Sequence, residues 1–347
     1  MLPIRFPLTL SPLLLLALGM LGAGCRSHPP APPLTRFKFN EPHMGTLFSI
    51  TLYATNADSA NAAAEAAFRK IGRLDQLMTD YNTNSELMRL PTRPVGESIP
   101  VSPEMFEILQ ESQRVARETD GAFDVTVGPF VRAWRAARKS KVMPSTEQIA
   151  QLRNSVGYQK LKLDPNQRTV ALLAPGMQLD LGGIAKGYAA DQALILMRKF
   201  GIRSALVAAS GDIAVGDAPP GLPGWQIGIG TMDDSDRVER KVLLKNAAVS
   251  TSGDTEQFVE INGIRYSHIV DPITGLGLTN RIQVTVIGPN ATITDGLDTP
   301  LSIMGIEKAL RFVEARKELS AIIVTKDETG LHHRLSHRFK KKFKQVE

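Results

Sequence analysis

Apolar and polar residues alternate along the chain with two periods, one typical of β-strands and one of α-helices. A period of two predicts an edge strand over residues 44–54. A hairpin is expected over residues 161–173, because Asp164–Gln167 has the composition of a turn. Further β-type runs occupy residues 204–215, 225–230, 241–250, 257–261, 282–287 and 321–326.

Helical periodicity separates these β-type runs. Ala63, Ala67, Ile71, Leu74 and Met78 share one face of a helix predicted over residues 58–78. Other helices are expected over residues 103–119, 131–140, 185–199 and 295–315, with a short one capped by Ser145. Because hairpins and helices are interspersed, the pattern predicts an α+β fold with mixed or largely antiparallel sheets and packed helices, and excludes a doubly wound parallel sheet.

The first residues have the features of a secretion signal. Arg5 precedes an apolar stretch over residues 8–22, which is shorter than the roughly twenty residues of a spanning helix. The stretch leads into Cys25, the only cysteine of the chain, through a segment similar to a bacterial lipobox, although Gly22 stands where Leu is usual. We expect a lipoprotein signal peptide over residues 1–24, lipidation of Cys25 and a Pro-rich tether over residues 25–36. The alternative is a plain signal peptide with a coincidental cysteine.

These features predict a protein of the bacterial cell envelope, lipid-anchored to a membrane and facing the periplasm. Arg26 replaces the Asp that often retains lipoproteins in the inner membrane, so the outer membrane stays open. The net charge of +6 owes much to residues 334–344, which we expect to be disordered, within a basic tail over residues 331–347 that contacts anionic lipid. A nucleic-acid partner is excluded, because a secretion signal precedes the body and no pattern of stacking aromatics accompanies the charge.

One segment, Leu179–Asp191, has the composition of an anion site. Gly182 and Gly183 precede a predicted helix, whose free N–H groups and dipole suit a phosphate, and Lys186 adds a cation. The spacing matches neither a Walker loop nor a dinucleotide fingerprint. An ordinary strand–turn–helix junction is the alternative.

Two further segments carry candidate chemistry. Asp295 and Thr299 lie four residues apart on a predicted helix, so that their oxygens could share a Mg²⁺ ion, or Asp295 could cap the helix. Asp298 is expected to face solvent. His268 stands in a turn marked by Pro272 and Gly275, where a structural role and acid–base work are both open.

Taken together, the segments LDLGGIAKGYAAD, GAFDVTVGP, MTDYNTNSE, STSGD, YSHIVDPITG and TDGLDT resemble, in the same order, the motifs of the ApbE family. The resemblance covers about residues 40–325 and favours the inner membrane as the place of the lipid anchor. It implies a two-lobed architecture related to the T-fold, formed by a flavin transferase domain over residues 37–330. It also implies an FAD:protein FMN transferase, which uses Mg²⁺ to cleave FAD, attaches FMN through a phosphoester to a Thr of a target flavoprotein, and releases AMP.

The same resemblance implies roles for individual residues. The Asp295 carboxylate, the Thr299 hydroxyl and the Ala185 carbonyl would hold the metal. The remaining implied positions contact FAD: Met44, Tyr81, Ala122, Phe123, Asp124, Gly182, Lys186, Tyr188 and His268. His268 and Asp180 are the candidates for the general base.

The chain departs from the family pattern at Pro300, at Ser210 and at Leu90–Pro91, none of which is a metal ligand. Two other functions remain open at this level. One is a Mg²⁺-dependent pyrophosphatase that splits FAD into FMN and AMP, and the other is a flavin-binding lipoprotein without catalytic activity.

Overall fold

A computed structural model describes residues 32–230, 232, 238–253 and 258–343. The predicted signal peptide and Cys25 lie outside the described residues. The chain divides into two units, Met1–Pro33 and Leu34–Glu347, and the second forms the folded body. Among the described residues, none of the helices combines the length and the apolar character needed to span a membrane.

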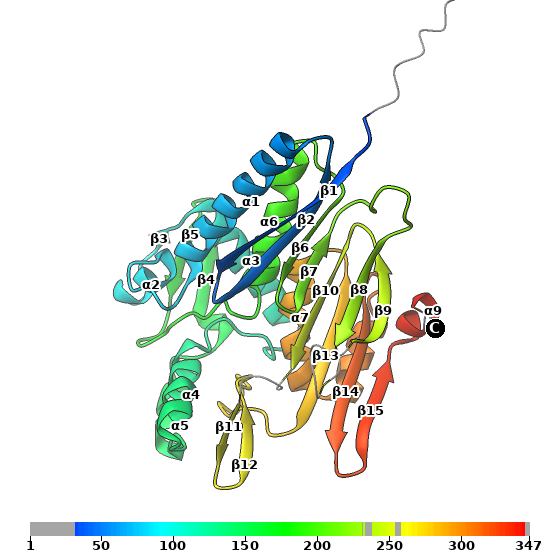
Figure 1. Ribbon diagram of the computed structural model, residues 1–347. Helices are drawn as coiled ribbons and strands as arrows, with labels where there is room; N and C mark the ends of the chain where they lie inside the picture. Colours follow the sequence, from blue (N-terminus) through cyan, green and yellow to red (C-terminus); the bar gives the residue numbers. More distant parts are fainter. Residues whose placement is uncertain (1–31, 231, 233–237, 254–257, 344–347) are drawn as a thin grey trace, which may run out of the picture. The chain divides into compact units, whose positions relative to one another are not determined.

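The body is built around one large antiparallel sheet, with the strand order β1-β2-β6-β7-β10-β13-β14-β15 (Figure 1). Each neighbouring pair in this order is antiparallel. The prediction of an α+β fold with largely antiparallel pairing is therefore confirmed. The strands are β1 (Thr35–His43), β2 (Thr46–Ala54), β6 (Ala205–Ala209), β7 (Asp212–Val215), β10 (Ala247–Gly253), β13 (Arg281–Gly288), β14 (Ser320–Asp327) and β15 (Gly330–Leu335).

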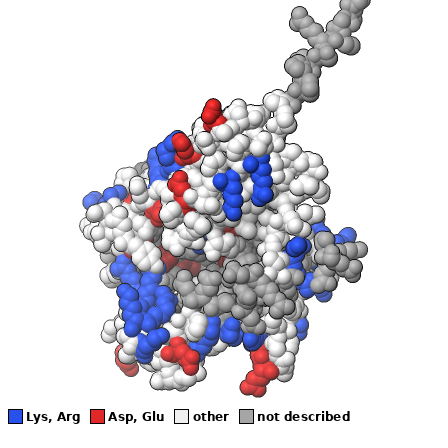
Figure 2. Space-filling model, in the orientation of Figure 1, with Lys and Arg blue, Asp and Glu red and all other residues white. Residues whose placement is uncertain are grey.

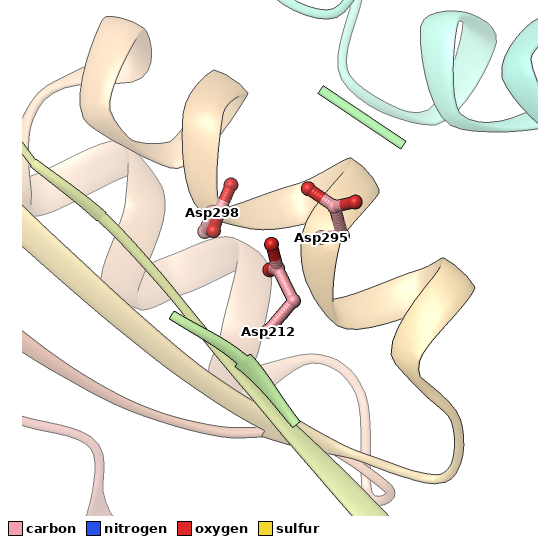
Figure 3. Close-up of side chains that lie close together, drawn as sticks. All are labelled: Asp212, Asp295 and Asp298. Carbon is pink, nitrogen blue, oxygen red and sulfur yellow. The ribbon is translucent and has the colours of Figure 1, made fainter. Parts of the chain in front are cut away.

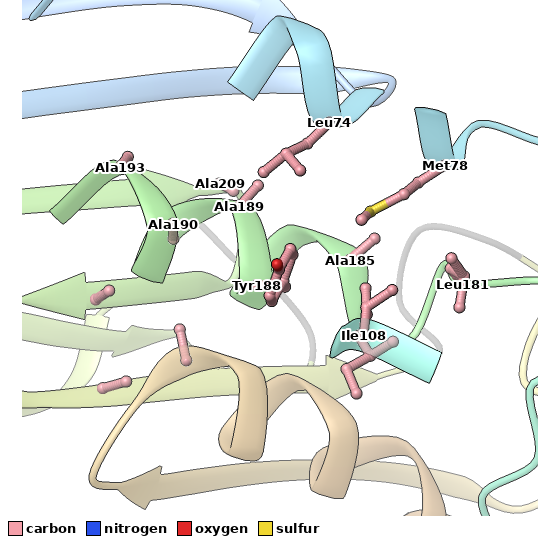
Figure 4. Close-up of a cluster of buried hydrophobic side chains, with 14 of the residues drawn as sticks. Leu74, Met78, Ile108, Leu181, Ala185, Tyr188, Ala189, Ala190, Ala193 and Ala209 are labelled. Atoms are coloured by element: carbon pink, nitrogen blue, oxygen red, sulfur yellow. The ribbon is translucent and has the colours of Figure 1, made fainter. Parts of the chain in front are cut away.

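Helices cover one face of this sheet. Helix α1 (Ala57–Met78) packs against α6 (Ala185–Lys199), and α6 packs against α7 (Ala291–Met304). Figure 4 shows the core between them, where Leu74 and Met78 approach the alanine-rich α6. Small residues such as Ala189 and Ala193 let the helices approach closely, because little side-chain volume separates the backbones. Helices α3 (Pro103–Glu118) and α8 (Ile306–Glu314) complete this layer.

A smaller layer covers the opposite face. It consists of the hairpin β8 (Trp225–Gly230) and β9 (Val238–Leu244) and of helix α9 (His337–Lys342). Phe339 of α9 is fully buried there among Ile322 and Val324 of β14.

Shorter elements extend the body on one side. They are α2 (Glu86–Arg89), the 3-10 helices η1 (Leu90–Thr92) and η2 (Tyr158–Lys160), β3 (Ile99–Pro100), α4 (Gly128–Ser140), α5 (Thr146–Arg153), β4 (Leu161–Asp164), β5 (Thr169–Leu172), β11 (Phe258–Ile261) and β12 (Ile264–Ser267). A third cluster, in which the ring of Trp134 of α4 lies 5.0 Å from that of Tyr266 of β12, joins the helix pair to the β11–β12 hairpin.

Three predictions about the helices and strands are wrong. Strand β2 is not an edge, because β1, which the pattern did not predict, pairs along its whole length. The helix expected over residues 295–315 is two helices, broken at Gly305, whose φ of 76° lies in the left-handed region that favours glycine. The basic C-terminal residues are not disordered up to Phe343, because Phe339 of α9 and Phe343, which caps the end of this helix, are both buried in the cluster on this face of the sheet.

Candidate active site

A cavity of about 820 Å³ opens where the loops of the main sheet meet the start of α6 and one face of α7. Its volume is in the range of small-molecule sites, about 300–1,000 Å³. It is lined by most of the residues singled out in the sequence: Met44, Tyr81, Ala122, Phe123, Asp124, Asp180, Gly182, Ala185, Lys186, His268, Asp295 and Thr299. The fold thus brings together segments that are far apart in the chain.

Three buried carboxylates meet on one wall of the cavity. Asp212 comes from β7, and Asp295 and Asp298 come from α7 (Figure 3). One oxygen from each lies within 4.8 Å of the others, and each residue is at most 3 % exposed. The Oδ1 atom of Asp212 is buried without a hydrogen-bond partner among the described residues. Such an unsatisfied oxygen is costly unless a cation or a donor reaches it.

Lys186 is the cation of this cluster. Its Nζ lies 2.5 Å from Asp212 Oδ2 and 3.5 Å from Asp295 Oδ1. One ammonium cannot balance three carboxylates, so burial and the neighbouring carboxylates raise the pKa of Asp295 to about 7 and that of Asp298 well above its usual value. This surplus of negative charge and the unsatisfied Asp212 oxygen fit a divalent metal with oxygen ligands.

Thr299 extends this oxygen-rich wall. Its hydroxyl lies 3.2 Å from Asp298 Oδ1 and 3.4 Å from the Ser252 hydroxyl. The expectation that Asp298 faces solvent is wrong. Helix α7 begins at Ala291 with Asn290 as its cap, so Asp295 is inside the helix and shares a buried face with Asp298 and Thr299.

The start of α6 is tied to this cluster. The Gly187 N–H donates to Asp295 Oδ2 over 2.8 Å, and the Ala185 N–H donates to the Leu181 carbonyl. These two amides of the first turn are therefore engaged within the protein. In the structure, the anion at the N-terminus of α6 is the Asp295 carboxylate. Gly182 and Lys186 both line the cavity and are open to a ligand there.

Aromatic and basic groups form another part of the wall. The Tyr81 side chain is 81 % exposed, and the guanidinium of Arg135 lies 4.7 Å from the centre of its ring. Arg135 also pairs with Asp80 and with Asp180, the latter over 3.3 Å. Arg135 thus links the Tyr81 loop to the loop that precedes α6.

The two aspartates of this region carry structural hydrogen bonds. Asp180 Oδ1 accepts from the Gly182 N–H over 2.8 Å, while burial raises the pKa of its carboxyl. Asp124 Oδ1 accepts from both the N–H and the hydroxyl of Thr126 over 2.7 Å, so its carboxylate orders a turn beside the cavity.

Tyr188 does not line the cavity formed by the described residues, contrary to its predicted contact with FAD. Its ring is 3 % exposed and belongs to the main core, and its hydroxyl donates to Glu107 over 2.6 Å. Tyr188 points into the interior because it follows Lys186 by two residues, which is about 200° around the helix, so the two side chains leave opposite faces of α6.

Sequence reasoning missed three groups of this site. Asp212 and Arg135 belong to no site predicted from the sequence, and Ser252 is included only as part of the STSGD segment. A signal for Asp212 exists in hindsight, because it follows a Ser-Gly turn at the start of a buried strand. Nothing in the sequence placed it beside α7.

Comparisons with known proteins agree with this geometry. Residues 44–323 match the model of the ApbE family. The chain is 33 % identical over 304 residues to the FAD:protein FMN transferase of Escherichia coli strain K12, which covers 86 % of each chain. It is 31 % identical over 335 residues to the FAD:protein FMN transferase of Vibrio cholerae, which covers 94 % of this chain and 97 % of that protein.

Solved structures show the same fold. The flavin transferase ApbE from Vibrio cholerae superposes with a TM-score of 0.81 at 30 % identity, covering 90 % of this chain and 100 % of the other. The ApbE protein of Thermotoga maritima gives a TM-score of 0.80 at 28 % identity, with the same coverage. The family match spans most of the chain, and the chain belongs to the ApbE family.

Proposed function

We propose that this chain is an FAD:protein FMN transferase, the activity for which its relatives in Escherichia coli and Vibrio cholerae are named. It binds FAD in the cavity and transfers the FMN moiety to a Thr hydroxyl of a target flavoprotein. The observation that carries this proposal is the joining, in one cavity, of an exposed aromatic ring at Tyr81 with the oxygen-rich wall of Asp212, Asp295, Asp298 and Thr299.

The reaction exchanges a phosphoanhydride linkage for a phosphoester linkage. The acceptor Thr oxygen attacks the phosphorus of the FMN half, a new P–O bond forms, and the P–O bond to the AMP half breaks. AMP leaves with the electron pair of that bond, and the Thr proton passes to a base. His268 and Asp180 both line the cavity and are the candidates for this base.

The residues present fit a resident Mg²⁺ ion. The carboxylates of Asp212, Asp295 and Asp298, the Thr299 hydroxyl and the Ala185 carbonyl would hold it. When bound, the metal neutralises the charge of the pyrophosphate, which is the main electrostatic demand of phosphoryl transfer. Lys186 supplies a further positive charge on the same wall.

The chain is further proposed to act at the cell envelope, lipidated at Cys25 and facing the periplasm, with exported flavoproteins as targets. Metabolic labelling with radioactive palmitate in a bacterial host tests the anchor. We expect label on the wild type and none on Cys25→Ala. A wild type without label would refute the anchor and leave the catalytic proposal intact.

Incubation of the purified chain with FAD, Mg²⁺ and a Thr-bearing acceptor domain tests the activity. We expect a fluorescent flavin band on the acceptor in a denaturing gel, together with release of AMP. A Thr→Val acceptor should stay unlabelled, and Asp295→Ala should abolish both products. AMP and free FMN without an adduct would identify a pyrophosphatase, and a yellow complex without AMP would identify a binding protein.

A further inference from the structure

The helix α4 presents a row of arginines beside the cavity. Arg132, Arg135 and Arg138 are spaced three residues apart, so their side chains leave neighbouring parts of one helix face. Figure 2 shows Lys and Arg side chains gathered over the region of α4, at the lower left of the view. Arg135 and Arg138 both line the cavity, so the basic face of α4 reaches its wall.

Only one arginine of this row is neutralised. Arg135 pairs with Asp80 and Asp180. Arg138 forms an ion pair with no carboxylate of the described chain, and burial together with the neighbouring Arg135 lowers its pKa. A guanidinium nevertheless stays protonated in proteins, so Arg138 places an uncompensated charge on the cavity wall.

The residues around Arg138 add to this charge. Arg132, Lys139 and Lys141 are exposed, and none of them forms an ion pair with a carboxylate that the structure describes. Arg132 contacts the sulfur of Met88 over 3.3 Å instead. A surface of this kind attracts an anion that comes from solution.

The phosphates of FAD are not the natural partner of this surface. In the proposed reaction the pyrophosphate lies at the wall of the carboxylate cluster, where Lys186 is the cation, with its Nζ 2.5 Å from Asp212 Oδ2 and 3.5 Å from Asp295 Oδ1. Arg138 instead shares the part of the cavity wall that Arg135 and Tyr81 form. Since the acceptor protein approaches the FAD-loaded cavity from outside, it is a partner that can bring an anion to Arg138.

We propose that α4 docks an acidic segment of the acceptor protein, with Arg138 pairing with a carboxylate that lies near the acceptor Thr. The basic residues Arg132, Lys139 and Lys141 attract this segment, and Arg138 fixes its register at the cavity. This inference rests on the proposed transferase activity, because only a transferase needs a second protein at this wall.

Binding of two fluorescein-labelled peptides to the full chain loaded with FAD tests the proposal. Both carry a central Thr; one is flanked by Asp and the other by Asn at the same positions. We expect the wild type to bind the Asp peptide about tenfold more tightly, or about 1.4 kcal/mol at 25 °C. Arg138→Glu should lose this preference and keep the wild-type Kd for FAD, measured by quenching of flavin fluorescence.

Lys199→Glu is the matched control, because Lys199 is an exposed cation at the far end of α6, about 21 Å along the helix from Ala185. It should keep the preference for the Asp peptide. Equal binding of both peptides by the wild type, or an equal loss in Lys199→Glu, would overturn the inference. So would a weakened Kd for FAD in Arg138→Glu with unchanged peptide binding, which would assign Arg138 to the flavin nucleotide.

Binding to vesicles of phosphatidylglycerol provides a further outcome. If Arg138→Glu abolished vesicle binding and left the peptide preference intact, the partner of α4 would be a membrane and the proposal would be wrong. The proposed activity is judged separately, by whether the wild type forms an FMN adduct on a Thr-bearing acceptor domain.

Discussion

The contact between α6 and α7 makes Gly187→Ala the most informative single substitution in this protein. A Cβ atom at Gly187 would lie 2.1 Å from the Ala291 carbonyl oxygen and 2.8 Å from Asp295 Cβ. These neighbours are a backbone atom and the first atom of a side chain, so no rotation about a side-chain bond relieves the overlap. The two helices would have to separate.

The size of this separation follows from the structure. Because Cβ atoms essentially never approach heavy atoms closer than 3.0 Å, α7 must shift by about 0.9 Å at least. Overpacking of this kind costs about 1–3 kcal/mol. The shift also lengthens the 2.8 Å bond from the Gly187 N–H to Asp295, and a hydrogen bond to a charged group contributes about 1.5–3 kcal/mol. The better helix propensity of Ala returns about 1 kcal/mol.

We therefore expect Gly187→Ala to lower the free energy of unfolding by about 2 kcal/mol or more, measured by urea denaturation, and to weaken metal-dependent AMP release. Gly296→Ala is the matched control in α7, since the neighbour nearest to its added Cβ is the end of the Ile184 side chain, at 3.3 Å, and the next contacts, with Ile184 and Val115, are ordinary ones at 3.6 Å. It should unfold within about 1 kcal/mol of the wild type. Wild-type stability in Gly187→Ala would refute the close approach of the two helices.

Three more predictions concern the cavity and the C-terminus. Without metal, the native fold raises the pKa of Asp298, whereas the unfolded chain ionises it above about pH 4. The folded protein is then destabilised as pH rises above that value. Asp298→Asn should therefore have a higher Tm than the wild type at pH 7 without metal, and its Tm should rise less when Mg²⁺ is added. A lower Tm for Asp298→Asn than for the wild type without metal would contradict this. Arg135→Gln should weaken FAD binding about tenfold by fluorescence quenching while the circular dichroism spectrum is kept, because the Tyr81 ring loses its cation; unchanged affinity would show that Arg135 does not order this wall. Phe339→Ala should lower the free energy of unfolding by about 3–5 kcal/mol in urea denaturation, because the ring is fully buried. An unchanged free energy of unfolding would indicate that the C-terminal residues are disordered.

Much of the fold was predictable because most elements follow from local signals. The helix over 58–78 was expected from the spacing of Ala63, Ile71 and Leu74, and α1 spans Ala57–Met78. The hairpin turned at Asp164–Gln167 is present as β4 and β5, because Asp164 accepts hydrogen bonds from the two amides that follow the proline. Such signals act within a few residues and need no tertiary context.

The wrong predictions occur where distant contacts outweigh the local pattern. The cluster of lysines at residues 340–342 predicts a solvated tail, but burial of Phe339 against β14 stabilises a short helix that includes these lysines. The continuous apolar pattern over residues 295–315 hid the break at Gly305, since periodicity continues across the two helices. In each case the deciding energy comes from residues far away in the sequence.

The candidate site divides in the same way. Asp295 and Thr299 could be paired from the sequence, because the spacing of four residues brings side chains together on any helix. Asp212 could not, because its place beside α7 depends on the pairing of β7 with β10 and on the passage of α7 over β10. Gly211 permits this approach, since a Cβ there would lie 2.8 Å from the Thr251 carbonyl oxygen of β10. The third carboxylate, and with it the surplus of charge that suits a divalent metal, is therefore a property of the assembled sheet and of no single motif.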